Sequence, residues 1–268
     1  MHESYRHAKS AQSAGPSAGD STHQALLTIM DEAGSTNSVM TETDRREALP
    51  HGYAIMARRQ TAGRGQRGNS WESEAGQNVT LSVMLRPEGV EAREQFMVSE
   101  AVAIATAGVV AELTGVQAEV KWPNDIYVGQ QKIAGILIEC GLEGGRISRA
   151  IAGIGLNVNQ SVWRSDAPNP VSMRQLTGEE YDTAATARLL VERVARLTAM
   201  LPAGADEIER SYAARLWRRE GRHLWEDAAS GEVFRAGIAR VERTGRLILD
   251  NGREYWFKEV KQVIPELP

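Results

Sequence analysis

The segment 120–159 constrains the fold most, because strand-like runs alternate in it with short glycine-containing turns. The first run is broken at Pro123 and resumes at 126–128, and a Gly-Gln turn leads to the run 132–139. A Gly-Gly turn then leads to the run 149–159. Connections this short join neighbouring antiparallel strands. The sequence therefore predicts consecutive hairpins within one sheet.

Three glycines, Gly135, Gly153 and Gly155, lie inside these runs. Glycine in the interior of a strand weakens the strand, and it often marks a bulge or the close approach of a ligand or another backbone. We therefore expect these strands to line a ligand cleft rather than to form a packed face.

The rest of the chain supplies further helices and strands. Apolar spacing predicts helices at 38–49, 96–113, 183–201 and 206–217, and strand-like runs lie at 26–29, 53–57 and 78–86. After Gly221 the chain changes to short strand-like runs at 233–241, 247–249 and 254–257. The Asn251-Gly252 pair between the last two is a strong hairpin signal. The sequence thus predicts helices and a sheet, followed by a small β-barrel.

A glycine- and arginine-rich loop, Arg58–Trp71, connects the runs 53–57 and 78–86. Its glycines let a ligand approach the backbone N–H groups, and Arg64 and Arg67 add two permanent cations. This combination suits a phosphate or another anion. The spacing matches neither the phosphate loop of NTPases nor the dinucleotide fingerprint. Taken alone, the loop is equally well interpreted as a solvated basic turn.

The tripeptide Ser35-Thr36-Asn37 precedes the first predicted helix. Ser and Thr are preferred residues at a helix N-cap, so a purely structural capping role is one interpretation. The other is that the hydroxyls and the helix-start N–H groups face a polar ligand. The tripeptide by itself leaves both open.

The overall composition argues against several classes of protein. Apolar residues make up 42% of the chain and charged residues 25%, which is typical of soluble globular proteins. The net charge of −4 argues against extensive nucleic-acid binding. We see no apolar run that approaches the ~20 residues of a membrane span and no amino-terminal signal core, which predicts a cytoplasmic protein. The single cysteine, Cys140, is interpreted as a buried structural thiol rather than a nucleophile.

Four stretches, taken together and in order, resemble the biotin–protein ligases, also called biotin–[acetyl-CoA-carboxylase] ligases. They are STN at 35–37, QTAGRGQRG at 60–68 with Trp71, KWPND at 121–125 with KIAGILIE at 132–139, and GIGLNVN at 153–159. The similarity covers roughly residues 26–217. The short strands that follow resemble the C-terminal SH3-like domain of that family.

The resemblance implies an α+β fold: a mixed β-sheet flanked by helices, as in the class II synthetase-like biotin ligase catalytic fold, with a C-terminal SH3-like β-barrel. We expect a flexible tail rich in Ala, Ser and Gly at 1–23, a biotin- and ATP-binding catalytic domain at 24–218, and the SH3-like domain at 219–268. Some members carry an N-terminal DNA-binding domain. Because the amino terminus is short and polar, we expect the ligase-only type.

The resemblance also implies a two-step reaction. Biotin and MgATP give biotinyl-5′-adenylate and pyrophosphate, and a lysine of a biotin carboxyl carrier protein then takes the biotin as an amide. The carrier belongs to acetyl-CoA carboxylase or a related biotin-dependent carboxylase. We expect neither nucleic acid nor a membrane as a partner, and a homodimer through the sheet edge, as in relatives, stays open.

Individual site residues follow from the resemblance. The positions implied to bind biotin are Ser35, Thr36, Asn37, Gln60, Gly63, Arg64, Gly65, Gln66, Lys121 and Gly135. Those implied to bind ATP or the adenylate are Arg64, Arg67, Trp71, Lys121, Asn124 and Asn157. Asp125 and Glu139 are candidates for holding Mg²⁺. Gln66 stands where the family often has arginine, which lowers the charge of the loop by one.

Lys121 and Arg64 are the implied catalytic residues. Lys121 matches the lysine that contacts the carboxylate of biotin and the α-phosphate, and a cation is needed there because one anion attacks another. No side-chain nucleophile is required, since the two substrates react with each other. We expect the Arg58–Trp71 loop to be mobile without ligand and to close over the adenylate.

Two alternatives remain. A lipoate–protein ligase is related in fold, but the Gly-Arg-Gly-Gln-Arg-Gly and Lys-Trp-Pro-Asn-Asp motifs favour biotin. A non-catalytic protein that sequesters biotinyl-adenylate is disfavoured because no DNA-binding domain is expected. A transfer assay with labelled biotin or lipoate separates the enzymes, and replacement of Lys121 separates catalysis from mere binding.

Overall fold

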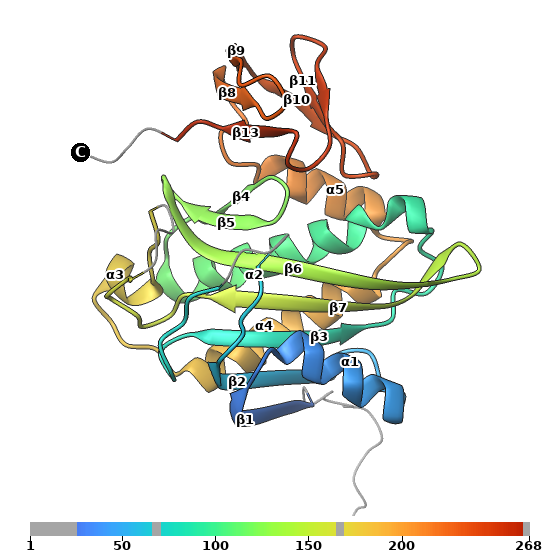
Figure 1. Cartoon of the computed structure of the whole chain (residues 1–268), viewed down its shortest axis with the longest axis vertical. Helices are drawn as coiled ribbons and strands as arrows, with labels where there is room; N and C mark the ends of the chain where they lie inside the picture. The colour runs from blue at the N-terminus through green and yellow to red at the C-terminus, as the bar shows by residue number, and fades with distance from the viewer. Residues whose placement is uncertain (1–25, 66–70, 165–168, 265–268) are drawn as a thin grey trace, which may run out of the picture.

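The computed structural model describes residues 26–65, 71–164 and 169–264 (Figure 1). The tail predicted at 1–23 therefore lies outside the described residues, as do Gln66 and Arg67 of the glycine- and arginine-rich loop.

One seven-stranded mixed sheet forms the centre of the molecule, with the strand order β1-β2-β3-β7-β6-β5-β4. Its strands are β1 (Leu27–Ala33), β2 (Ala54–Gln60), β3 (Val79–Leu85), β4 (Glu119–Lys121), β5 (Asp125–Val128), β6 (Gln131–Glu143) and β7 (Arg146–Leu156). Strands β1 and β2 are parallel, and every other neighbouring pair is antiparallel. The predicted hairpins and the mixed α+β fold are confirmed.

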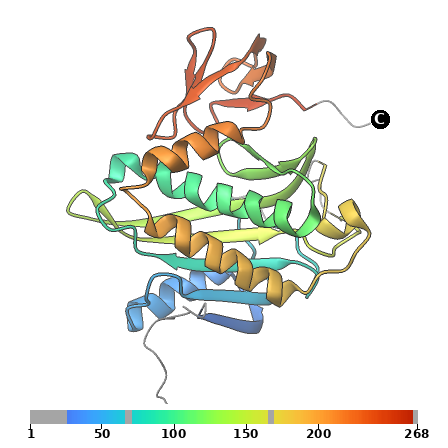
Figure 2. The same ribbon diagram turned by 180° about the vertical axis from the view of Figure 1, so that it is seen from behind.

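Helices cover the two faces of this sheet unequally. The described helices are α1 (Thr36–Arg46), α2 (Phe96–Thr114), α3 (Met173–Thr177), α4 (Thr183–Ala199), α5 (Ala205–Ala214) and the short 3-10 helix η2 (Ala92–Glu94). Helices α2, α4 and α5 lie on the back (Figure 2), whereas α1 lies in front of β2, β3 and β7 (Figure 1). Strand β3 is buried at every position because α1 and α4 pack on its opposite faces. The front of β4, β5 and β6 is left for the site.

Helix α2 is the core helix of the domain. With the preceding turn it spans Ala92–Thr114 at a mean hydropathy of 1.7, and it is the one described helix long and apolar enough to cross a membrane. The expectation that no run approaches that length was wrong for this segment. Most of the helix is buried between the sheet and helices α4 and α5. A helix that is apolar all round occurs in the core of a large domain as well as in membranes.

The C-terminal strands form two three-stranded sheets, β10-β11-β12 and β13-β8-β9. Their bounds are β8 (His223–Asp227), β9 (Val233–Ala236), β10 (Ile238–Val241), β11 (Leu247–Leu249), β12 (Glu254–Tyr255) and β13 (Val260–Gln262). The Asn251-Gly252 hairpin is confirmed between β11 and β12, with Gly252 at φ 82°. Closure of these strands into a barrel, and the domain boundary at 218/219, stay predictions.

Several contacts tie these strands to the seven-stranded sheet and to helix α5. The indole N–H of Trp122 donates to the carbonyl oxygen of Gly245 at 3.0 Å, and its ring meets Phe257 edge-on at 6.3 Å. Arg243 forms ion pairs with Asp206 and Glu209 of α5. The C-terminal part of the chain is thus attached through the residue next to Lys121.

Several elements differ from the sequence prediction. Helix α5 ends at Ala214 rather than at 217, because the chain leaves the helix there to pair with β4. The Val120 N–H donates to the carbonyl oxygen of Arg215 at 2.7 Å, and the Trp217 N–H donates to the carbonyl oxygen of Val120 at 2.8 Å. The run predicted as one strand at 233–241 is divided at Gly237 into β9 and β10. Strands β8 and β13 and helix α3 were not assigned from the sequence.

Candidate functional site

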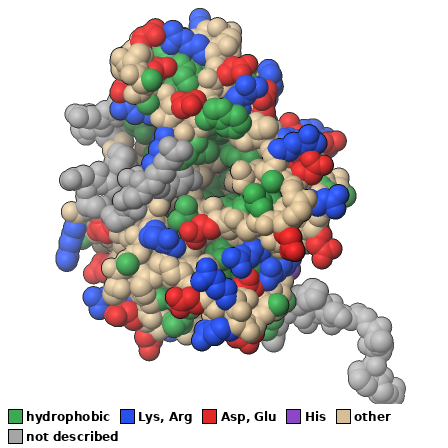
Figure 3. Space-filling model, turned by 45° about the vertical axis from the view of Figure 1, so that its right-hand side comes forward, with side chains coloured by type: hydrophobic (Ala, Val, Ile, Leu, Met, Phe, Trp, Pro, Cys, Tyr) green, Lys and Arg blue, Asp and Glu red, His purple; other side chains and the backbone are tan. Residues whose placement is uncertain are grey.

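A cavity of about 1280 Å³ lies between the front of the sheet and the C-terminal strands. Figure 3 shows the corresponding hollow, with hydrophobic side chains in its depth. The sequence-predicted site residues that line it are Ser35, Thr36, Asn37, Gln60, Arg64, Gly65, Trp71, Lys121, Asn124, Asp125, Gly135 and Asn157. Positions far apart in the chain are therefore brought to one site. Gly63 and Glu139 are not among the lining residues, and Gln66 and Arg67 lie outside the described part of the chain.

One end of the cavity is built from hydroxyl and amide groups at the start of α1. Ser35 occupies the N-cap position, but its side chain makes no capping hydrogen bond with the described residues. Instead, Gln60 Oε1 accepts the Thr36 backbone N–H at 2.8 Å and the Thr36 hydroxyl at 3.3 Å. The helix start is capped by Gln60 from β2, so the capping interpretation of the tripeptide does not hold for Ser35, which lines the cavity.

A buried hydroxyl on β3 connects this end to the next residue. Ser82 Oγ lies 2.7 Å from Thr36 Oγ1 and 2.6 Å from Asn37 Oδ1. Ser82 is completely buried, and a half-satisfied polar group there would be costly. The network therefore fixes the Thr36 and Asn37 side chains in one arrangement. The sequence analysis missed Ser82, and its signal is a hydroxyl residue inside a mostly apolar strand.

The network continues to a carboxylate and an arginine. Asn37 Nδ2 donates to Glu139 Oε2 at 2.7 Å, and Arg64 pairs with Glu139 Oε1 at 3.5 Å. Arg64 also donates to Ser38 Oγ at 3.2 Å. Glu139 thus orients Asn37 and Arg64 from behind the cavity wall. Of the two proposed magnesium ligands, Asp125 is the one that lines the cavity.

The glycines of β6 and β7 make room for side chains. Gly135 and Gly155 are direct partners in the β6–β7 register. A Cβ on Gly155 would lie 2.3 Å from Trp71 Cε2, and one on Gly135 would lie 3.0 Å from Trp71 Cζ3. Trp71 therefore lies against the bare backbone of both strands. Its buried Nε1 has no hydrogen-bond partner among the described residues.

Gly153 makes room for Asn37 of the hydroxyl–amide network, since a Cβ on Gly153 would lie 2.6 Å from Asn37 Oδ1. All three strand glycines line the cavity, as the sequence predicted. What approaches them in this structure is the protein's own Trp71 and Asn37.

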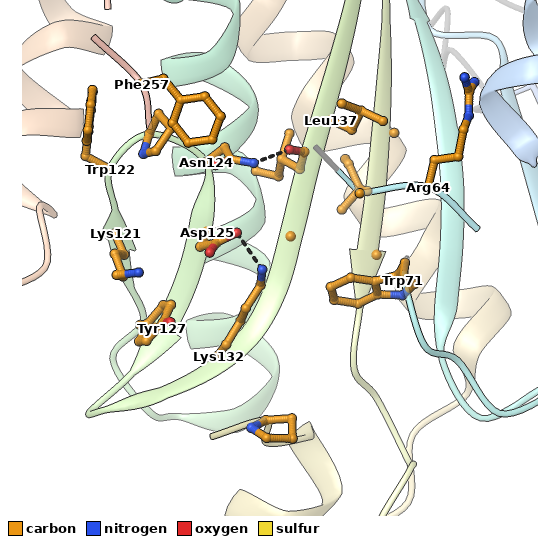
Figure 4. Close-up of a pocket in the computed structure, with 18 of the residues that line it drawn as sticks. Arg64, Trp71, Lys121, Trp122, Asn124, Asp125, Tyr127, Lys132, Leu137 and Phe257 are labelled. Carbon is orange, nitrogen blue, oxygen red and sulfur yellow. Dashed lines mark hydrogen bonds and ion pairs between the residues drawn. The ribbon is translucent and has the colours of Figure 1, made fainter. Parts of the chain in front are cut away.

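The other end of the cavity carries two lysines and one carboxylate (Figure 4). Lys121 on β4 is the register partner of Asp125 on β5, and Lys132 Nζ lies 2.7 Å from Asp125 Oδ1. Burial lowers the pKa of Lys121, and the charge of Asp125 opposes that shift. The sequence analysis assigned no role to Lys132. Its signal is a lysine followed by an apolar run that extends to Glu139.

The two predicted asparagines position backbone. Asn124 Nδ2 donates to the carbonyl oxygen of Ile136 at 2.5 Å, which fixes the KWPND segment to β6. Asn157 Nδ2 donates to Val171 O at 3.0 Å. The buried Oδ1 of Asn157 has no partner within the described ranges, so one acceptor remains for a ligand.

The donor set fits a magnesium ion held mainly by a nucleotide. Among the described residues no group of three His, Cys, Asp or Glu side chains could hold a metal ion. Mg²⁺ commonly takes one or two carboxylates together with substrate phosphates, and Asp125 is such a carboxylate.

Cys140 is only half-buried, not fully buried as expected, and burial raises the pKa of its thiol. A raised pKa leaves less of the nucleophilic thiolate.

Comparisons with known proteins show which family the chain is similar to. Residues 31–157 match the model of the biotin/lipoate A/B protein ligase family. The biotin–[acetyl-CoA-carboxylase] ligase of Mycobacterium tuberculosis is 32% identical over 231 residues, which is 84% of each chain. The bifunctional ligase/repressor BirA of Bacillus subtilis is 36% identical over 164 residues, 59% of this chain and 49% of that protein. The chain thus spans about half the length of that relative.

A solved structure supports the fold. The biotin protein ligase from Aquifex aeolicus in complex with biotin and ATP superposes with a TM-score of 0.72 over 89% of this chain and 99% of that chain. At 21% identity this likeness concerns the fold.

Proposed function

The chain belongs to the biotin/lipoate A/B protein ligase family, and we propose that it activates biotin with MgATP and transfers it to a lysine of a biotin carboxyl carrier protein. The proposal rests on one observation: a single cavity has two ends of different chemistry. A fixed hydroxyl–amide network lies at one end, and Lys121, Lys132 and Trp71 lie at the other. A polar ring system and a nucleotide can therefore meet in one cavity.

The network at the start of α1 suits the ureido ring of biotin. That group has both donors and acceptors, and it would lose free energy if it were buried unpaired. Ser35 offers a hydroxyl without a capping bond among the described residues, and Thr36, Asn37 and Gln60 are already fixed by one another through Ser82. A site that is fixed before binding loses little conformational entropy when the ligand enters.

Lys121 serves the first step. A carboxylate oxygen of biotin attacks the α-phosphorus of ATP, the bond to the β-phosphate breaks, and pyrophosphate leaves. Lys121 lines the cavity, and we assign its ammonium the role of screening the two anions and stabilising charge on the α-phosphoryl oxygens. Burial lowers the pKa of Lys121, but arriving anions favour its charged form. Magnesium, when bound, would neutralise phosphate charge, and Asp125 is the residue to hold it.

The second step requires that the biotinyl-adenylate stay bound in the cavity, and it needs no nucleophilic side chain of this protein. The amine of the carrier lysine attacks the carbonyl carbon of the mixed anhydride, an amide forms, and AMP leaves with the bonding electrons. Arg64 is held by Glu139 at the cavity edge, where a guanidinium favours the anionic adenylate. Gln66 and Arg67, expected to complete the loop, remain predictions.

The partners and location are part of the proposal. The carrier is the biotin-bearing domain of acetyl-CoA carboxylase or a related carboxylase, in keeping with the name of the M. tuberculosis relative. We place the reaction in the cytoplasm, where ATP is available. A homodimer through the sheet edge at β1, which ends the strand order, is the proposed assembly. The expectation of no nucleic-acid or membrane partner stays a prediction.

The test is a transfer assay. Purified protein is incubated with MgATP, a biotin carboxyl carrier domain, and either labelled biotin or labelled lipoate. We expect ATP-dependent labelling of the carrier by biotin. Lipoate is the second candidate, because the family model covers both kinds of ligase. Labelling from lipoate alone would contradict the proposal.

A further inference from the structure

Two lysines share one carboxylate in the cavity wall, and the proposed first step uses only Lys121. Asp125 lies between them: it faces Lys121 across β4–β5, and its Oδ1 lies 2.7 Å from Lys132 Nζ (Figure 4). The cluster therefore carries one more positive than negative charge. Such an excess in a cavity attracts an anionic ligand.

Lys132 is directed towards the part of the cavity occupied by Trp71. Its Nζ lies 5.7 Å from the centroid of the Trp71 ring, and 3.4 Å from the position that a Cβ on Gly135 would take. Lys121 Nζ lies instead over the Tyr127 ring, 5.1 Å from its centroid. The two ammonium groups thus serve different parts of one cavity, on either side of Asp125.

The backbone of Lys132 is fixed while its side chain is not enclosed. Its N–H donates to Asn169 O at 2.8 Å, and its carbonyl oxygen accepts from Val171 N–H at 3.0 Å. The side chain is 27% exposed. Rotation about the side-chain bonds alone can therefore exchange the carboxylate of Asp125 for another anion, without movement of β6.

We propose that Lys132 is a second catalytic lysine, which binds the β- and γ-phosphates of ATP and stabilises the charge of the departing pyrophosphate. In this structure Asp125 holds it in place. This inference rests on the proposed adenylation reaction. When the bond between the α-phosphorus and the bridging oxygen breaks, the electron pair goes to pyrophosphate, and a mobile ammonium at that position lowers the barrier. Release of Lys132 also frees Asp125 to face the nucleotide.

A purely structural role is the alternative, because the pair also links β5 to β6. These strands are already joined by a backbone ladder from Asp125 to Gln131. An ion pair that is partly open to water adds little to such a ladder. A structural role predicts equal effects on both half-reactions, whereas a role towards pyrophosphate predicts an effect on the first alone.

The experiment separates the half-reactions. Adenylate formation is followed as biotin-dependent pyrophosphate release at varied MgATP, and transfer is followed from synthetic biotinyl-5′-adenylate, which has no β- or γ-phosphate. We compare Lys132→Gln and Lys132→Arg with wild type. The matched control is Arg193→Gln, which removes an equally short ion pair, 2.7 Å to Glu112, between helices on the back of the sheet. Thermal unfolding is recorded for each variant.

We expect Lys132→Gln to reduce kcat/KM for ATP about 100-fold, the effect of losing one charged donor to a transition state. Transfer from synthetic adenylate should stay within about threefold of wild type, and Lys132→Arg should restore part of the loss because it keeps the charge. Equal slowing of both half-reactions, or unchanged adenylate formation, would overturn the inference. Failure of the proposed function itself is distinguishable, since wild type would then release no biotin-dependent pyrophosphate.

Discussion

The buried carboxyl of Glu100 predicts an unusual dependence of stability on pH. Glu100 lies on α2, is 1% exposed, and its Oε2 has no hydrogen-bond partner among the described residues. Burial raises its pKa from 4.5 to about 8, the charge of Glu209 adds to the shift, and Arg243 opposes it. We therefore expect the substitution Glu100→Gln, which keeps the shape and removes the ionisation, to stabilise the protein at high pH.

The sign and size follow from proton linkage. The folded state holds this proton more tightly than the unfolded state, so stability is lost as the pH rises from 4.5 through about 8. At 1.36 kcal/mol per pKa unit, a shift of this size limits the loss in the free energy of unfolding to about 5 kcal/mol. The neutral amide of Gln does not ionise. The variant and wild type should therefore be similar at pH 5, and the variant should be several kcal/mol more stable at pH 9.

Denaturant unfolding at pH 5, 7 and 9, followed by tryptophan fluorescence, measures this difference. The control is Glu112→Gln on the same helix, whose carboxylate is 45% exposed and paired with Arg193. Effects of pH on the rest of the protein cancel in the comparison of variant with wild type. A difference between Glu100→Gln and wild type that is the same at pH 5 and pH 9 would refute a buried, protonated carboxyl.

Three further predictions concern the cavity. Lys121→Ala should slow biotin-dependent pyrophosphate release at least ~100-fold without changing the circular dichroism spectrum, and an unchanged rate would refute its role in the first step. Gly155→Ala should displace Trp71, because the new Cβ would lie 2.3 Å from the ring, and should weaken ATP binding measured by calorimetry. Its control, Gly108→Ala, meets nothing within 4 Å and should stabilise α2 by up to about 1 kcal/mol. Ser82→Ala should raise the KM for biotin and lower stability by about 1–3 kcal/mol, since two buried polar partners lose a hydrogen bond. An unchanged KM would mean that the network does not shape the pocket.

Much of the fold could be predicted because its signals are local. The turns at Gly129 and Gly144 fix the hairpins β5–β6 and β6–β7, and both glycines have the positive φ that other residues avoid. The burial of most of α2 is visible in its apolar composition. The glycines in β6 and β7 correctly indicated a cavity.

The remaining features depend on contacts between distant residues. Nothing near Ser35 in the chain shows that Gln60 caps the helix, and nothing near Glu139 shows that it faces Asn37 and Arg64. The early end of α5 is likewise set by pairing with β4. Periodicity reports which face of an element is buried, but not which side chain lies against it.

The bare glycines of β6 and β7 have an energetic consequence for the sheet. Glycine inside a strand costs roughly 0.5–1 kcal/mol relative to alanine, so Gly135, Gly153 and Gly155 together forgo about 2 kcal/mol of stability. Side chains from outside these two strands occupy the room that the glycines leave: Trp71 lies against Gly135 and Gly155, and Asn37 lies against Gly153. They supply van der Waals contacts that β6 and β7 do not make with side chains of their own. A ligand that holds Trp71 and Asn37 in place should therefore protect the amides of β6 and β7 from hydrogen exchange more than those of β1 and β2.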